Sequence, residues 1–223
     1  MLKVTRFNFI NHSISFSIVL VVASLLKVSF ILGSKKAFFS GVDIVSPLSG
    51  ALGGPLAVLA FFFSRYLLSS ASPFLFVVRH MPGVFGAWYW GSSSVLIRVV
   101  VPVLCMALFL MHPTGLEAFA YSFFWLIPVA LYFLDVKSPF AEALGSTFVV
   151  HAVGSVIWLY TTPMSAAQWW LLIPVVMVER FVFATIQAGI VQIYFYINNV
   201  GTKYNLSDKV KKTLRKLVPT FAS

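Results

Sequence analysis

Three ionisable residues interrupt long apolar stretches and are the main candidates for chemistry. Glu179 and Arg180 are adjacent within residues 168–197, and His151 lies within residues 140–162. At about 1.5 Å of rise per helical residue, all three lie near the middle of their segments. Adjacent helical residues project about 100° apart, so we expect Glu179 and Arg180 to reach different neighbouring helices rather than each other.

His151 also belongs to a polar stripe on its own segment. Thr147, His151 and Ser155 recur at every fourth position, which places them on one face of a helix. Two interpretations of this stripe stay open. It either clamps neighbouring helices together through hydrogen bonds, or it relays protons or coordinates a ligand.

A second polar set lies toward the external ends of the apolar segments. Lys27, His112 and Glu117 supply charge and hydrogen-bonding groups there. Their aromatic and amide neighbours are Tyr121, Trp125, Trp158, Tyr160, Gln168, Trp169 and Trp170. Polar groups that converge among aromatic rings are typical of a ligand pocket, whereas Trp and Tyr rings by themselves also mark a membrane interface.

Catalytic motifs are scarce in this sequence. It contains no pattern for nucleotide hydrolysis, dinucleotide binding or zinc proteolysis. Ser24 and Lys27 have the spacing in which a desolvated lysine can activate a serine, but no oxyanion-binding group accompanies them. The single cysteine, Cys105, forms neither a disulfide framework nor a cysteine metal cluster. We therefore predict no catalytic residue, no metal and no cofactor.

The composition indicates what kind of elements hold these residues. Of 223 residues, 60% are hydrophobic and 10% are charged, and the mean hydropathy is +0.93. Soluble domains carry about 25% charged residues, so the composition excludes a soluble globular protein and a disordered one. The net charge of +10 comes from basic residues at segment ends and in the tail, which favours contacts with anionic lipids and not with nucleic acid.

A membrane-spanning helix needs roughly 20 mostly apolar residues. Segments of about this length predict an all-α, multi-pass membrane bundle of about six helices. The predicted spans are residues 12–33, 48–70, 94–112, 116–135, 140–162 and 168–197. Basic residues outside the spans are concentrated on one side, with Lys35 and Lys36 as the exception, and this bias predicts cytoplasmic N- and C-termini in the cell membrane.

Residues 71–93 do not fit this pattern of spans. Arg79, Pro82 and Gly83 interrupt the apolar run and should break a long helix. We expect an interfacial or re-entrant cytoplasmic loop here rather than a seventh span. Arg65 and Arg98, near cytoplasmic span ends, are expected to act as anchors that reach toward the head groups.

We expect one transmembrane domain over residues 1–200 and a basic amphipathic cytoplasmic tail over residues 201–223. Apolar residues recur in this tail at helical spacing. Its basic residues are Lys209, Lys211, Lys212, Arg215 and Lys216. Such a helix would bind anionic lipids of the inner leaflet, the alternative being a solvated tail that only sets orientation.

Small residues indicate two close helix contacts. They surround Gly50 at the start of the second span and Gly145 in the fifth.

The broken entrance to the second span, Ser46-Pro47-Leu48-Ser49-Gly50-Ala51-Leu52-Gly53-Gly54-Pro55, together with the chain size and the predicted helices, resembles the substrate-binding S-components of energy-coupling-factor vitamin transporters. This resemblance implies a ligand that arrives from outside and ATP hydrolysis by partner subunits. The alanine-rich coupling motif of that family has no counterpart here, since the first span offers only Ala23.

The leading prediction for function is a membrane protein that binds or takes up a small solute, alone or with energising membrane partners. The alternative is a membrane protein of structural or assembly function in which the same polar groups hold helices together. A membrane-embedded hydrolase comes third.

Overall fold

The computed structural model describes residues 27–28, 39–52, 62–63, 66–67 and 72–203. Within the predicted span 12–33, Lys27 and Val28 are therefore the described residues, and they form a strand, β1 (Lys27–Val28). This strand pairs antiparallel with β2 (Phe39–Ser40). Most of the predicted span 48–70 and the tail from residue 204 onward lie outside the described residues.

Short helical pieces follow β2 in the region that the Gly/Pro-rich sequence marks. They are α2 (Gly41–Val45), the 3₁₀ turn η1 (Ser46–Leu48) and α3 (Ser49–Leu52). The Ser49 hydroxyl donates a hydrogen bond of 2.8 Å to the Ser46 carbonyl. Because a serine hydroxyl competes with the backbone for such carbonyls, it favours turns and short helices over a long one.

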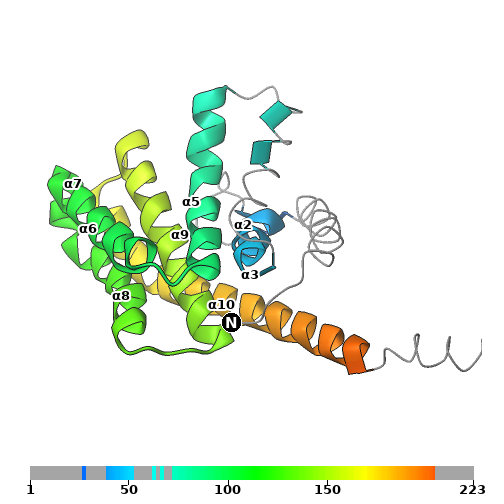
Figure 1. Cartoon of the computed structure of the whole chain (residues 1–223). Coiled ribbons are helices and arrows are strands. Elements are labelled where there is room, and N and C mark those ends of the chain that lie inside the picture. Colours follow the sequence, from blue (N-terminus) through cyan, green and yellow to red (C-terminus); the bar gives the residue numbers. More distant parts are fainter. Residues whose placement is uncertain (1–26, 29–38, 53–61, 64–65, 68–71, 204–223) are drawn as a thin grey trace, which may run out of the picture. The chain divides into compact units, whose positions relative to one another are not determined.

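The expected loop over 71–93 is wrong, because residues Pro73–Gly91 form one continuous helix, α5 (Figure 1). Pro82 lies inside it and offers no N–H to the Val78 carbonyl, which is the reason a break was expected. The helix survives because it packs against α9, η1 and α3. Tertiary burial of this helix outweighs the local cost of the proline.

Two apolar helical stretches follow α5 and correspond to the predicted spans 94–112 and 116–135. The first consists of the π-helical turn η2 (Leu96–Val100) and α6 (Val101–Met111). The second consists of α7 (Pro113–Glu117), the 3₁₀ helix η3 (Phe119–Trp125) and α8 (Leu126–Phe133). The widened η2 turn precedes Pro102, whose missing N–H leaves the Arg98 carbonyl without its ordinary helical donor.

The two remaining helices, α9 (Pro139–Thr161) and α10 (Ala166–Lys203), are long and apolar enough to cross a membrane. Local signals place their boundaries. The Ser138 side chain accepts a 3.1 Å hydrogen bond from the Ala141 N–H, and Pro139 begins α9, where its missing N–H is harmless. The predicted spans 140–162 and 168–197 agree with both helices.

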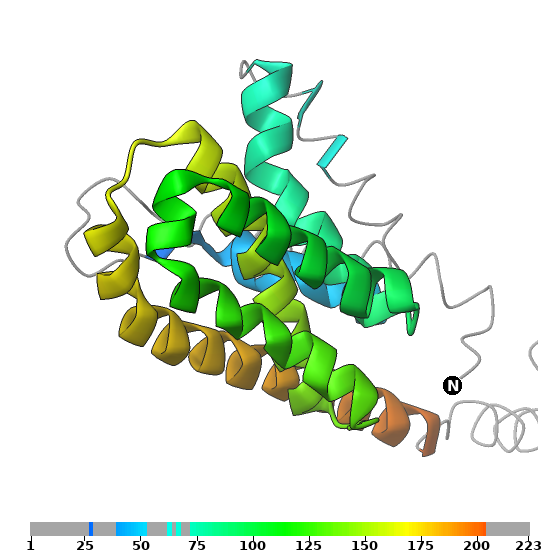
Figure 2. The same ribbon diagram turned by 90° about the vertical axis from the view of Figure 1, so that its left-hand side faces the viewer.

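The described residues belong to two compact units, Met1–Ala188 and Gly189–Ser223, with the boundary inside α10. In the first unit, α6, η3 and α8 pack against α9 (Figure 2). A core of buried residues from these elements also includes Trp169, Val176 and Ala184 of α10. This core surrounds the polar residues of the candidate site.

Both predicted small-residue contacts are present in the structure. A Cβ atom on Gly145 of α9 would collide with the ring and hydroxyl of Tyr89 in α5. A Cβ atom on Gly50 of α3 would collide with the Ala87 backbone of α5. Gly145 and Gly50 therefore allow α9 and α3 to approach α5 closely.

Candidate functional site

Polar and aromatic side chains meet in the core of the first unit. We call Tyr121, Trp125, His151, Ser155 and Trp169 the interior cluster. The Tyr121 ring centroid lies 4.8 Å from that of Trp169, 5.3 Å from that of His151 and 6.3 Å from that of Trp125. The hydroxyl groups of Tyr121 and Ser155 are 3.4 Å apart and share a hydrogen bond. The cluster thus brings together η3, α9 and α10, which are distant in sequence.

Three ring nitrogens of the interior cluster are buried without a hydrogen-bond partner among the described residues. They are Nε1 of Trp125, Nε1 of Trp169 and Nε2 of His151. Each buried group without a partner costs about 1–3 kcal/mol. An indole N–H only donates, so a group with acceptor atoms is needed to satisfy the two tryptophans.

Glu179 and Arg180 of α10 form an ion pair, which corrects the expectation that they reach different helices. Their nearest carboxylate oxygen and guanidinium nitrogen are 2.8 Å apart, and their side chains are 8% and 5% exposed. The flexible side chains close the gap that the helical projection of about 100° opens between adjacent Cβ atoms. The Arg180 guanidinium also lies over the Phe183 ring, 4.7 Å from its centroid.

The Glu179–Arg180 ion pair interacts electrostatically with the interior cluster. The charge of Arg180 acts on both Tyr121 and His151. Oε1 of Glu179 has no hydrogen-bond partner within the described part of the chain. The structure therefore unites residues of both predicted polar sets, with the Glu179–Arg180 pair near enough to act on them. The united residues are Tyr121, Trp125, His151, Ser155 and Trp169.

A second ionic site joins three elements and was not predicted. Arg98 of η2 binds Glu142 of α9 through two hydrogen bonds of 2.7 and 3.0 Å. It also donates to the Ser92 carbonyl at 2.9 Å and to the Tyr89 carbonyl at 3.2 Å. Arg98 is therefore an internal clamp between α5, η2 and α9, not the outward-reaching anchor that the sequence predicted.

The Tyr89 ring completes this clamp. The Arg98 guanidinium carbon lies 4.4 Å from the ring centroid, within range of a cation–π interaction. Burial raises the pKa of Tyr89 to about 12, so its hydroxyl keeps its proton at neutral pH. No direct sequence signal indicates the clamp, because Glu117 and Asp135 are both nearer to Arg98 in sequence than Glu142 is.

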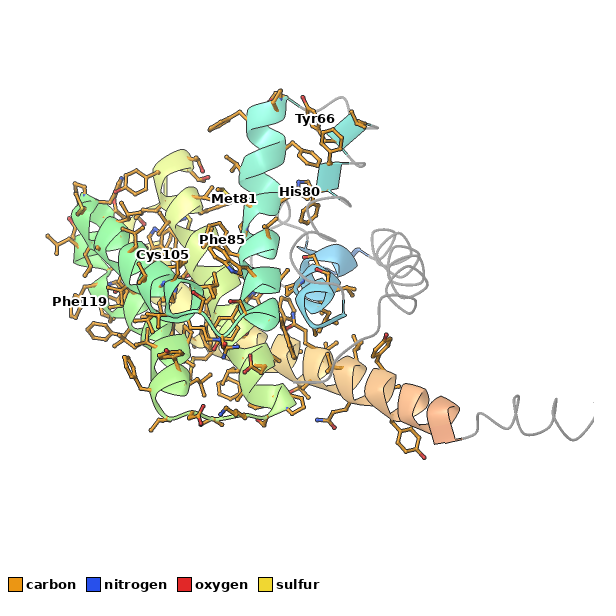
Figure 3. All side chains as sticks on the ribbon, viewed as in Figure 1. Tyr66, His80, Met81, Phe85, Cys105 and Phe119 are labelled. Carbon is orange, nitrogen blue, oxygen red and sulfur yellow. The ribbon has the colours of Figure 1, made fainter. Side chains whose placement is uncertain are left out.

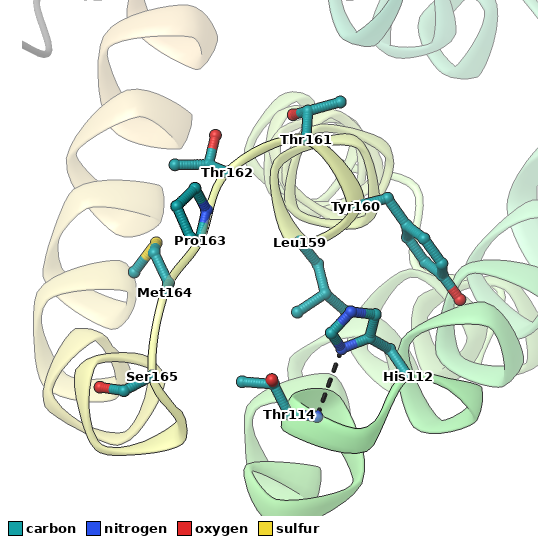
Figure 4. A pocket seen from close by; sticks show the side chains of 9 residues that line it. All are labelled: His112, Thr114, Leu159, Tyr160, Thr161, Thr162, Pro163, Met164 and Ser165. Atoms are coloured by element: carbon teal, nitrogen blue, oxygen red, sulfur yellow. Dashed lines mark hydrogen bonds between the residues drawn. The ribbon is translucent and has the colours of Figure 1, made fainter.

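A surface pocket of about 540 Å³ lies where α6 meets α7 and where α9 connects to α10 (Figure 4). His112 and Thr114 line one side of it, and residues 159–165 line the other. His112 is thus one of the predicted external residues that lies at a pocket. The His112 and Tyr160 rings meet edge to face there, with centroids 5.1 Å apart.

The rest of the predicted external set is dispersed. The side chain of Glu117 is exposed, and its carbonyl accepts a 3.2 Å hydrogen bond from Trp170 Nε1. Trp158 is also exposed and donates to the Met164 sulfur at 2.9 Å. Tyr121 and Trp125 belong to the interior cluster. Only the backbone of Lys27 is described, in β1, so the set does not form one aromatic pocket among the described residues.

Other residues have less to contribute to a site. Cys105 is buried in the helical core (Figure 3). His80 packs between Phe62 and Phe76, with ring centroids 4.7 and 4.2 Å away, and so stabilises α5. Within the described ranges, no group of three His, Cys, Asp or Glu residues could hold a metal ion. Ser24, Arg65 and the tail residues Lys209, Lys211, Lys212, Arg215 and Lys216 lie outside the described residues.

None of the protein-family models, curated proteins or solved structures compared with this chain matches it.

Proposed function

We propose that the chain is a multi-pass protein of the cell membrane that binds a small solute in the interior cluster and takes part in its uptake. The observation that carries this proposal is the trio of buried ring nitrogens without partners. A folded core normally satisfies its buried polar groups, and exceptions call for an explanation such as an absent ligand. A solute with acceptor atoms would satisfy the indole N–H groups of Trp125 and Trp169.

The aromatic rings of the cluster suit the same purpose. Ligand sites combine apolar and aromatic walls with a few polar groups that fix the orientation of the ligand. Tyr121 and the two indoles supply such walls, and His151 supplies a group that can either donate or accept.

The buried Glu179–Arg180 ion pair couples ligand binding in the interior cluster to movement of α10 in this proposal. A solute that accepts hydrogen bonds near His151 changes the field around Arg180, whose carboxylate partner Glu179 is on the same helix. Because charged groups inside a membrane protein are costly, their arrangement responds strongly to a new dipole. We propose that His151, Glu179 and Arg180 transmit ligand binding to α10.

Composition and helix length support the membrane part of the proposal. The chain is 60% hydrophobic, and α9 and α10 are each long enough to cross a bilayer. Large apolar side chains such as Leu171, Met111 and Phe133 are more than 70% exposed, which favours lipid over water as their surroundings. A bundle of about six spans with cytoplasmic termini, a tail on anionic lipids and energising partner subunits belong to the same proposal.

Native mass spectrometry of the gently solubilised protein tests the proposal directly. We expect a reproducible small-molecule adduct that is not a lipid. Trp125→Phe should lose it, because the substitution removes a buried donor while keeping an aromatic ring. Trp170→Phe is the matched control, because the Trp170 N–H is already bonded to the Glu117 carbonyl at the surface.

Other results would contradict solute binding. A chain that carries no adduct but a stoichiometric protein partner would indicate the structural or assembly function instead. An adduct retained equally by both tryptophan variants would place the solute outside the interior cluster.

A further inference from the structure

The surface pocket has a set of hydrogen-bonding groups that the protein itself does not use. Its volume of about 540 Å³ is within the range of roughly 300–1,000 Å³ that is typical of small-molecule sites. Some lining hydroxyls are already engaged. Tyr160 donates to the Leu108 carbonyl at 2.9 Å, and Thr161 donates to the Ile157 carbonyl at 2.7 Å.

The His112 imidazole presents a free donor. Its Nδ1 accepts a 3.2 Å hydrogen bond from the Thr114 backbone N–H (Figure 4). A neutral imidazole that accepts at Nδ1 carries its proton on Nε2. The Nε2–H group is therefore available, and the hydroxyls of Thr114 and Thr162 make no hydrogen bond within the described part of the chain.

The lining also selects by charge. His112 is its one titratable side chain apart from Tyr160, and no Asp, Glu, Lys or Arg side chain lines the described pocket. A charged solute would lose water without gaining a counter-charge, which is costly. Leu159, Pro163 and Met164 supply apolar wall between the polar groups. This combination suits an uncharged solute that both donates and accepts hydrogen bonds.

Leu159 joins the pocket to the interior cluster. It lines the pocket and belongs to the same buried core as Tyr121, Trp125 and Trp169. We infer that the pocket formed by His112, Thr114 and Thr162 is a recognition site for an uncharged, hydrogen-bonding solute. This inference rests on the proposed function. In that proposal the solute first binds in the surface pocket and then moves to the interior cluster.

Chemical labelling of His112 tests the inference on the full-length protein. Diethylpyrocarbonate acylates an accessible neutral imidazole at whichever ring nitrogen lacks the proton, and peptide mass spectrometry reads each histidine separately. His151, whose Nε2 is enclosed, serves as the internal reference for unfolding. The probes are three matched sets built on phenyl, pyridyl and cyclohexyl rings, each set comprising the carboxamide, the carboxylate and the methylammonium compound.

We expect at least one carboxamide to protect His112 from modification. The charged compounds of the same set should reach equal protection only at a concentration at least about tenfold higher, which corresponds to about 1.4 kcal/mol in binding free energy. Thr162→Val should weaken protection about threefold to tenfold because it removes a free hydroxyl. Thr185→Val is the matched control and should leave protection unchanged, since the Thr185 hydroxyl donates to the Phe181 carbonyl of its own helix at 2.9 Å and Thr185 does not line the pocket.

Several results would overturn the inference. These are no protection by any of the carboxamides, protection by a carboxylate or ammonium compound as strong as by its carboxamide, and equal effects of the two threonine variants. The Trp125→Phe variant separates this inference from the proposed function. If Trp125→Phe loses the small-molecule adduct but a carboxamide still protects His112, the surface pocket is supported independently of the interior cluster. If the wild-type protein carries the adduct but no carboxamide protects His112, only the interior cluster is supported.

Discussion

Replacing Arg98 by Gln should destabilise the protein strongly, because this side chain holds three elements together. The substitution removes two hydrogen bonds to Glu142 and two to the carbonyls of Tyr89 and Ser92. It also leaves the Glu142 carboxylate without its counter-charge. The side chains of Arg98 and Glu142 are 13% and 23% exposed, so water can replace only part of what is lost.

The size of this effect follows from the burial of the pair. Removing one partner of a buried ion pair costs about 3–5 kcal/mol. Because Glu142 keeps some contact with water, we expect Arg98→Gln to lower the free energy of unfolding by about 2–4 kcal/mol. Glu142→Gln should cost less, about 1–2 kcal/mol, since its amide oxygen can still accept one hydrogen bond.

Thermal unfolding in one detergent, followed by tryptophan fluorescence at a fixed scan rate, measures these effects. For a chain of this size about 1 kcal/mol corresponds to about 2–4 °C in Tm, so Arg98→Gln should lower Tm by roughly 5–15 °C. In a double-mutant cycle, the variant with both substitutions should be more stable than the sum of the single effects predicts, by at least about 1 kcal/mol.

The pair of Asp135 and Lys137 provides a matched control. Its charged atoms are 2.8 Å apart, against 2.7 Å for Arg98 and Glu142. The Asp135 and Lys137 side chains, however, are 73% and 78% exposed. Asn tolerates the positive φ of 49° at this position, and an exposed pair contributes about 0–1 kcal/mol. Asp135→Asn should therefore shift Tm little. An equally small shift for Arg98→Gln, or an additive cycle, would refute the argument that Arg98 clamps the fold.

Three further predictions concern the core. Glu179→Gln and Arg180→Gln should each destabilise the solubilised protein by about 2–4 kcal/mol, since either leaves a buried charge without its partner; wild-type Tm in both would show that the pair is solvated. Gly145→Ala should cost about 1–3 kcal/mol of stability, because the added methyl group collides with Tyr89. Gly189→Ala is the control and should stabilise α10 by up to about 1 kcal/mol, because its methyl group meets nothing within 4 Å. Equal Tm shifts for the two variants would refute the close contact. Burial raises the pKa of Tyr89 to about 12 from an ordinary value of 10.0. The contribution of Tyr89 to the free energy of unfolding should therefore be full below pH 10 and lost as the pH rises toward 12. Tyr89→Phe should remove this loss when stability is measured against pH.

Sequence reasoning succeeded where local signals decide the structure. Helix α9 begins and ends close to the predicted boundaries, because apolar length, the Ser138 cap and Pro139 act within a few residues of one another. Helix α10 begins close to its predicted start but continues to Lys203, beyond the predicted end at residue 197. The small residues around Gly145 predicted a close contact for an equally direct reason. A side chain without a Cβ atom shows where another helix can approach, even though it does not identify that helix.

Local signals misled the prediction for residues 71–93. Pro82, Gly83 and Gly86 weaken a helix there, and α5 forms nonetheless because α9, η1 and α3 cover it. The burial of a whole helix face is a sum over distant contacts, which no short window of sequence contains.

The amino-acid sequence by itself determined that the chain is apolar, helical and poor in charges, and that His151, Glu179 and Arg180 interrupt apolar segments. These are properties of composition and spacing. Only the tertiary structure decided the partners of each polar group. Arg98 and Glu142 are 44 residues apart, and Tyr121 meets Ser155 across 34 residues. Hydrogen bonds and ion pairs act over a few ångströms, so the packing of whole helices determines which groups come within that distance.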